Sequence, residues 1–129
     1  MVDLAELKTI VQDDGRLRRR WTPLPQHLDT YRRLLQRIKP SRCSLLIVLP
    51  YSQRRTRPDW TRIVAISRHR IPFSVVEELA PLLAPAVVEM GVVPLIMPLA
   101  EQDLSQMDWK TPIVKAMSDN GYLLFANKS

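Results

Sequence analysis

The chain of 129 residues has few of the residues on which several common kinds of site depend. Cys43 is its single cysteine, which excludes an internal disulfide and a metal site built from several thiolates. Its three glycines make a glycine-rich phosphate loop hard to build. The longest apolar runs, including Leu45–Leu49 and Val92–Leu99, are far shorter than the roughly 20 residues that span a bilayer. We therefore expect no membrane partner.

What the chain does contain is enough for one folded domain. A hydrophobic fraction of 46% is sufficient for a packed core at this length. The N-terminus carries Asp3 and Glu6 and lacks the basic-then-apolar pattern of a secretory signal. A cytoplasmic protein is the expectation.

Positive charge is concentrated in one half of the sequence. Residues 1–70 hold 16 Lys and Arg against 6 Asp and Glu, a net charge of +10. Residues 71–129 hold 3 Lys and Arg against 7 Asp and Glu, a net charge of −4. This asymmetry favours one face for a polyanion and another face for a different partner.

Hydrophobic periodicity and capping residues predict the order helix, helix, strand, strand, helix, strand, helix, strand. Pro81 and Pro85 predict that the third helix is kinked or split. Pro94 and Pro98 place the third strand at an edge or a bulge. The expected elements are Asp3–Gln12, Gln26–Lys39, Ser44–Leu49, Thr61–Ser67, a helix from Ser74 to a stop at Gly91, Val92–Pro98, a helix from Thr111-Pro112 to Asn120-Gly121, and Tyr122–Phe125.

These elements predict an α/β fold with a small mixed sheet and flanking helices. The first two strands are close enough in sequence to form a hairpin, and the third helix returns the chain to the same sheet by a crossover. Residues 26–129 form the expected domain, and residues 1–25 add an N-terminal helix and a basic linker. The apolar stripe Leu4, Leu7 and Val11 of that helix docks either on its own domain or on another chain.

Several stretches of the chain resemble the minimal nucleotidyltransferases, the family to which antitoxin-type nucleotidyltransferases belong. The resemblance covers roughly residues 26–125. It is carried by Lys39-Pro40, Arg57-Pro58-Asp59, Val75–Leu79, Val88–Met97 and Thr111–Leu124. It implies a nucleotidyltransferase-like sheet. It also implies a role in two-component toxin–antitoxin modules, where relatives sit beside an all-helical protein that some of them nucleotidylate.

The chemistry of that family transfers poorly to this sequence. Those enzymes hold two metal ions with an Asp-x-Asp pair and a third acid, because Mg²⁺ prefers carboxylate oxygen. Where that family has a Gly-Ser motif, this sequence reads Tyr51-Ser52. Its Asp-x-Asp pair aligns either with Asp59-Trp60-Thr61 or with Thr61-Arg62-Ile63, so at most one of the two acids is present. Ser52 and Asp59 are therefore remnants at most, and no metal site or cofactor is expected. Mg²⁺ and ATP enter only if the chain is an active enzyme.

Two arginine-rich segments are the candidate anion sites. Ser52, Gln53, Arg54, Arg55 and Arg57, with Arg62 beyond them, offer guanidinium forks and neutral donors that suit phosphate. Arg18, Arg19 and Arg20 precede Trp21, an aromatic residue able to stack on a base. The alternative for the first segment is a solvated basic loop between two strands, and for the second it is a flexible linker whose Trp21 packs onto the core.

Three functions remain open from the sequence. The first is a degenerate nucleotidyltransferase-like protein, a pseudoenzyme that binds a partner protein through its N-terminal helix or its acidic C-terminal half. The second is an active transferase that moves a nucleotide from ATP to a partner protein or RNA. The third is a basic accessory subunit that binds nucleic acid. We favour the first, with a helical toxin-like protein or a larger complex as partner. Homo-oligomer formation stays open.

Overall fold

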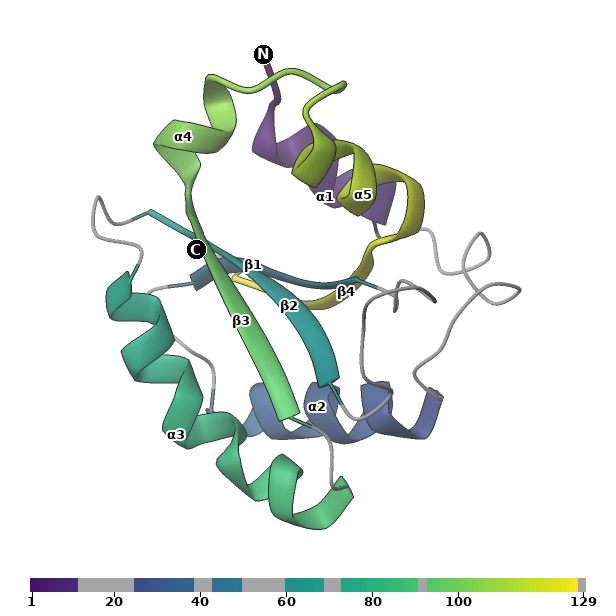
Figure 1. Ribbon diagram of the computed structural model, residues 1–129, viewed down its shortest axis with the longest axis vertical. Coiled ribbons are helices and arrows are strands. Elements are labelled where there is room, and N and C mark those ends of the chain that lie inside the picture. The colour runs from purple at the N-terminus through teal and green to yellow at the C-terminus, as the bar shows by residue number, and fades with distance from the viewer. Residues whose placement is uncertain (12–24, 39–42, 50–59, 69–72, 91–92, 128–129) are drawn as a thin grey trace.

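A computed structural model describes residues 1–11, 25–38, 43–49, 60–68, 73–90 and 93–127 of the chain. Within these residues the protein is a mixed α/β structure, with helices covering both faces of a four-stranded sheet (Figure 1). The elements are α1 (Leu4–Val11), α2 (Pro25–Ile38), β1 (Cys43–Leu49), β2 (Trp60–Ser67), α3 (Phe73–Met90), β3 (Val93–Ala100), α4 (Glu101–Ser105), α5 (Pro112–Asn120) and β4 (Tyr122–Ala126).

The predicted order of elements is confirmed apart from α4, which the sequence did not reveal. The strands lie in the order β3-β2-β1-β4. β1 is antiparallel to both β2 and β4, which confirms the predicted hairpin. β3 is parallel to β2, so α3 is the crossover helix between them, and β3 lies at an edge as its prolines predict.

The central strand β1 is buried along its whole length. Alternate side chains of a strand point to opposite faces, so a strand that is buried throughout needs a layer of helices on each side. Leu46 and Val48 pack in a first core with α2, α3 and β2, whereas Leu45, Ile47 and Leu49 pack in a second core with α1, α4 and α5. Two hydrophobic cores therefore lie on opposite faces of one sheet, and β1 contributes to both.

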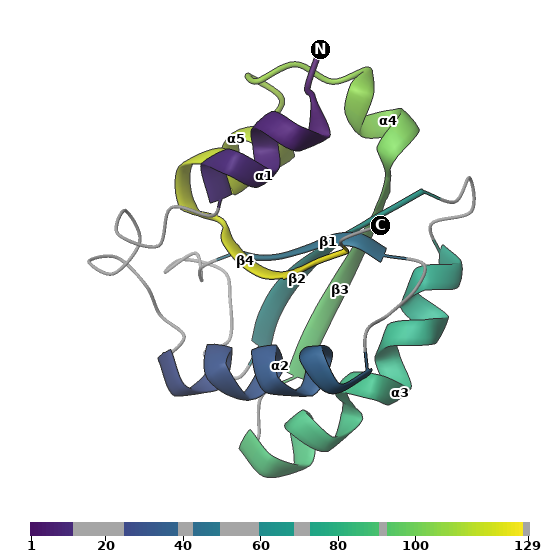
Figure 2. The ribbon, with the colours of Figure 1, turned by 180° about the vertical axis from the view of Figure 1, so that it is seen from behind.

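The N-terminal helix packs on its own chain. Leu7 and Val11 of α1 are fully buried in the second core, and α1 lies alongside α5 (Figure 2). The Asp3 carboxylate accepts a hydrogen bond from the Ala5 N–H at 3.1 Å, as expected of an N-cap. The Val2 N–H donates to the Met107 carbonyl at 3.0 Å. Of the two predicted docking modes of this helix, the structure adopts the intramolecular one.

α3 is one helix from Phe73 to Met90 that bends along its length (Figures 1 and 2), so of the predicted kink or split at Pro81 and Pro85 the split does not occur. Both prolines are exposed, on the side of the helix away from the first core. A proline removes the hydrogen bond from its own nitrogen to the carbonyl four residues earlier. On an exposed face water hydrates those carbonyls, which lowers the cost of the missing bonds.

Among the described residues, no helix combines the length and the apolar character needed to cross a membrane.

Gly121 is the residue at which α5 turns into β4. Its N–H donates to the Met117 carbonyl at 2.8 Å, and it is buried against β1. A Cβ added there would collide with the Met117 carbonyl oxygen and lie 2.7 Å from Ile47 Cγ2. The glycine is therefore required by close packing.

We expect Gly121→Ala to lower the free energy of unfolding by about 1–3 kcal/mol, because the central strand and α5 must move apart. Chemical denaturation measures this change. Asp119→Ala, at an exposed position of the same helix, is the control and should change stability by less than about 0.5 kcal/mol. Equal stability of Gly121→Ala and the wild type would contradict the close packing.

Candidate functional site

Of the residues predicted to bind phosphate or nucleic acid, Arg62 lies within the described part of the chain. The other predicted positions lie outside the described residues: Arg18, Arg19, Arg20, Ser52, Gln53, Arg54, Arg55, Arg57 and the remnant acid Asp59. The candidate binding regions in the described part of the chain are therefore Arg62 and the exposed surfaces of the helices and strands.

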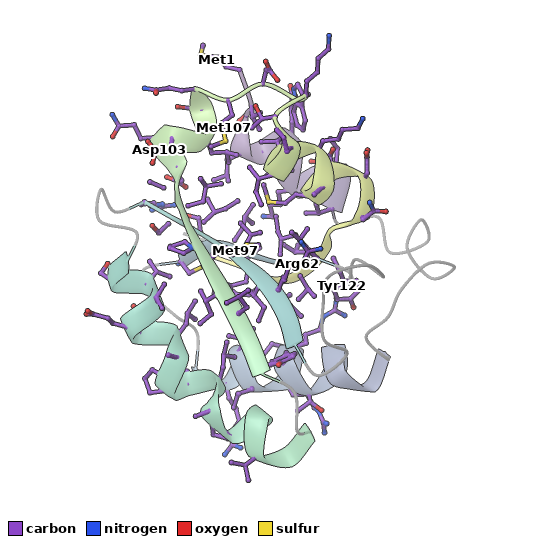
Figure 3. The ribbon with its side chains drawn as sticks, in the orientation of Figure 1. Met1, Arg62, Met97, Asp103, Met107 and Tyr122 are labelled. Atoms are coloured by element: carbon purple, nitrogen blue, oxygen red, sulfur yellow. The ribbon has the colours of Figure 1, made fainter. Side chains whose placement is uncertain are left out.

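Arg62 stands on β2, between the two neighbouring strands. It pairs with Leu49 of β1 and with Leu95 of β3. Alternation along β2 puts it on the face that carries Val64 and Ile66, toward α1 and α5. Its side chain is half-buried, and Leu95 beside it is 41% exposed. The guanidinium thus lies at the margin of the second core, at the end of the sheet where β2 begins (Figure 3).

The strands around Arg62 supply no carboxylate. β1, β2 and β3 together contain no Asp or Glu. In the described part of the chain, no group of three or more His, Cys, Asp or Glu residues is placed to hold a metal ion. The described strands therefore provide no carboxylate to hold a metal ion beside Arg62, and Coulomb repulsion from its guanidinium would oppose binding of Mg²⁺ there.

The other end of β1 carries polar side chains with structural partners. The Ser44 hydroxyl donates to Glu101 Oε1 at 2.8 Å and so connects the central strand to α4. The Asn127 N–H donates to the Ser44 carbonyl at 2.9 Å. The Ser44–Glu101 bond fixes the junction of β3 and α4 against β1, and the Asn127 bond holds the end of β4 against β1.

Cys43 is a buried core residue. Its thiol donates toward the carbonyl oxygens of Leu45 at 3.2 Å and Ile66 at 3.5 Å. Burial, and secondarily the negative charge of Glu78, raises the pKa of the Cys43 thiol from 9.0 to about 12. A buried thiol that stays protonated at neutral pH is a poor nucleophile.

A basic surface lies on α2, on the opposite side of the sheet from Arg62. The Arg32 guanidinium sits 4.8 Å above the centre of the Tyr122 ring and donates to the Leu123 carbonyl at 3.3 Å. Arg33 and Arg37 are exposed on the same helix. Arg32 therefore joins α2 to the edge strand β4, and a charge at such an edge opposes pairing with another strand.

The outer face of α3 is an exposed apolar surface. Buried Val75, Leu79 and Leu83 hold the inner face against the sheet. The exposed described residues of this helix follow a single stripe on the opposite side, here called the α3 stripe: Glu77, Ala80, Pro81, Ala84, Pro85 and Val88. Val88 is 87% exposed. A solvent-facing helix normally carries charged or polar residues on this side, so the α3 stripe has the composition of a contact surface.

Sequence reasoning missed the α3 stripe, although a signal for it exists. From Leu79 to Val88 the sequence contains no polar or charged residue. One helix face buried against a sheet does not require so long a run without interruption. The predicted alternative surface, α1, presents a shallow hollow lined by Ala5, Glu6, Thr9 and Ile10, a mixed set in which polar residues interrupt the apolar ones.

We expect native protein at pH 8 to resist alkylation of Cys43 by iodoacetamide, and denatured protein to react fully, because the native thiol is buried and protonated. Mass spectrometry measures the modified fraction. Ser105→Cys in a Cys43→Ala background places a thiol at an exposed position and should react without denaturation. Rapid alkylation of native Cys43 would show that the thiol is accessible and ionised.

The raised pKa also sets the sign of the pH effect on stability. Because the folded-state pKa exceeds that of the unfolded chain, the Cys43 contribution is complete below pH 9.0 and is lost as the pH rises toward about 12. Cys43→Ala should remove this part of the alkaline loss of stability.

The fold and these surfaces were compared with known proteins. Searches of protein-family models, of curated proteins and of solved structures return no significant match.

Proposed function

We propose that this chain is a degenerate nucleotidyltransferase-like protein that acts as a protein-binding partner, in the manner of an antitoxin or an accessory subunit. The observation that supports the binding role is the α3 stripe, a largely apolar surface that the fold leaves exposed. The core of a protein interface is depleted of charged residues, as are the positions from Ala80 to Val88 of the α3 stripe. A partner that covered them would remove apolar area from water at about 25 cal/mol per Å².

The loss of catalysis is supported by the residues around Arg62. Nucleotidyl transfer needs divalent ions that neutralise the developing phosphoryl charge, and carboxylates to hold those ions. Under the alignment that puts the acid pair on Thr61 and Ile63, Ile63 pairs with Val48 and Ile96, and none of these three apolar side chains is able to bind Mg²⁺. The neighbouring row on the other face of the sheet, Leu49, Arg62 and Leu95, also lacks a carboxylate.

Anion binding is compatible with the same row. The Arg62 guanidinium is half-buried, and an arginine recognises phosphate without a metal ion. Retention of a nucleotide or phosphate by Arg62 and by the loop residues Arg54, Arg55 and Arg57 stays a prediction.

The proposal is tested by incubating the protein with labelled ATP, Mg²⁺ and candidate helical partner proteins. We expect no transfer of label to any partner, because one remnant acid, Asp59, does not make a two-metal site. Asp59→Ala should be indistinguishable from the wild type in this assay. Robust transfer that Asp59→Ala abolishes would establish the active-transferase alternative instead.

A further inference from the structure

We propose that the α3 stripe binds an amphipathic helix of a partner protein, one whose apolar ridge is flanked at both ends by Lys or Arg. The inference rests on the proposed protein-binding function and names the chemistry of the partner. It follows from three properties of the α3 stripe: its shape, its lack of hydrogen-bond donors and its charge.

The shape of the α3 stripe suits a helix. Its members recur at intervals of one, three or four residues from position 77 to position 88, so they form one ridge along the helix. At a rise of 1.5 Å per residue the ridge is about 16 Å long, or three turns. Its apolar side chains are small at Ala80 and Ala84, which lets a second helix approach closely and insert larger aliphatic side chains between the turns.

The backbone of the α3 stripe offers acceptors. Because Pro81 and Pro85 have no N–H, the carbonyls of Glu77 and Pro81 lack their usual donors within the helix. Both prolines are exposed on the stripe, so these carbonyls lie along it. A partner that covers them must supply donors, because a buried carbonyl without a hydrogen bond costs about 1–3 kcal/mol.

The charge of the α3 stripe is negative at both ends. Glu77 is exposed at one end, and the whole of α3 contains glutamates but no Lys or Arg. At the other end, near Val88, no basic residue in the last turn offsets the negative end of the helix dipole. Lysine or arginine side chains of a partner would satisfy both the charges and the open carbonyls.

The same properties disfavour three other occupants. In a two-fold contact between two copies of α3, each Glu77 would face the negative C-terminal end of the other helix. An added β-strand would meet the adjacent edge strand β3, where Pro94 and Pro98 remove N–H donors. A nucleic acid or an anionic membrane carries the same sign of charge as the α3 stripe.

Two synthetic peptides test this proposal on the full-length protein. Both repeat leucine every three to four residues to form one helical ridge; one carries lysine at both ends and the other carries glutamate at the same places. We expect the lysine peptide to bind, as measured by fluorescence anisotropy, at least about tenfold more tightly than the glutamate peptide at low salt, since opposite charges attract over the Debye length. Amide chemical-shift changes on adding the lysine peptide should map to α3.

Matched substitutions separate the α3 stripe from general effects of charge. Ala84→Arg should weaken binding of the lysine peptide at least about tenfold, because it blocks the ridge and repels lysine. Ala5→Arg makes the same change at an exposed position of α1 and should have little effect. Glu77→Gln should weaken binding about two- to threefold, whereas Glu6→Gln on α1 should not. Circular dichroism verifies that each variant is folded.

Three results would overturn the proposal. The first is that the lysine peptide fails to bind, or binds no better than the glutamate peptide. The second is binding that Ala5→Arg weakens as much as Ala84→Arg. The third is concentration-dependent dimerisation of the wild type that Ala84→Arg abolishes, which would make a second copy the occupant. None of these assays contains nucleotide. A negative result in them would therefore overturn the helix-binding proposal without bearing on whether the protein transfers label from ATP.

Discussion

Complete burial of β1 is the constraint on which the rest of the structure depends. A strand whose seven residues are all buried must be covered on both faces, and it must also be paired on both edges to satisfy its backbone. β2 and β4 meet the second requirement, and the helices of the two layers meet the first. The N-terminal helix α1 belongs to this solution, because without Leu7 and Val11 the second core would open to water. Gly121 belongs to it as well, since it allows α5 to lie directly on Ile47.

This constraint also determines where function is to be sought. Both faces of the sheet are occupied by packed aliphatic side chains, so the middle of the sheet has no room for a ligand. Within the described residues, the exposed surfaces include the margin near Arg62 and Leu95, the basic side of α2 and the outer side of α3, besides the mixed outer sides of α1, α4 and α5. The half-buried Arg62 suits an anion and opposes a divalent metal ion. The α3 stripe is apolar and poor in donors, which suits a protein. These opposite chemistries correspond to the two halves of the sequence, one of net charge +10 and the other of −4.

Much of the fold was predictable because its determinants are local. The uninterrupted apolar run Leu45–Leu49 identified the central strand, and Pro94 and Pro98 identified an edge. The short helix α4 was missed, because its five residues are too few for a periodic pattern and only Leu104 of them is buried. The apolar stripe on α1 indicated which of its side chains are buried. It did not indicate which elements they pack against, because β1 and α5 are distant in sequence. The effect of Pro81 and Pro85 depends on the exposed side of the helix, which their sequence positions alone do not reveal.

Prediction of the site was less complete for a related reason. Arg62 was recognised by its type, but its neighbours Leu49 and Leu95 come from other strands, and only the register brings them together. The α3 stripe was overlooked because a sequence pattern is usually searched for its buried face. The excess of apolar residues from Leu79 to Val88 becomes meaningful once Leu79 and Leu83 are known to satisfy the core.

The central claim is that this protein acts by docking a basic helix on α3. Site-specific photo-crosslinking in the natural host tests it most directly, with benzoylphenylalanine in place of Ala84 on α3 and, as the control, in place of exposed Asp103 on α4. We expect a covalent adduct from position 84 and none from position 103, with the crosslinked peptide mapping to a helical segment flanked by Lys or Arg. An adduct formed from position 103 but not from position 84, or an adduct at position 84 with a second copy of this chain, would contradict the claim.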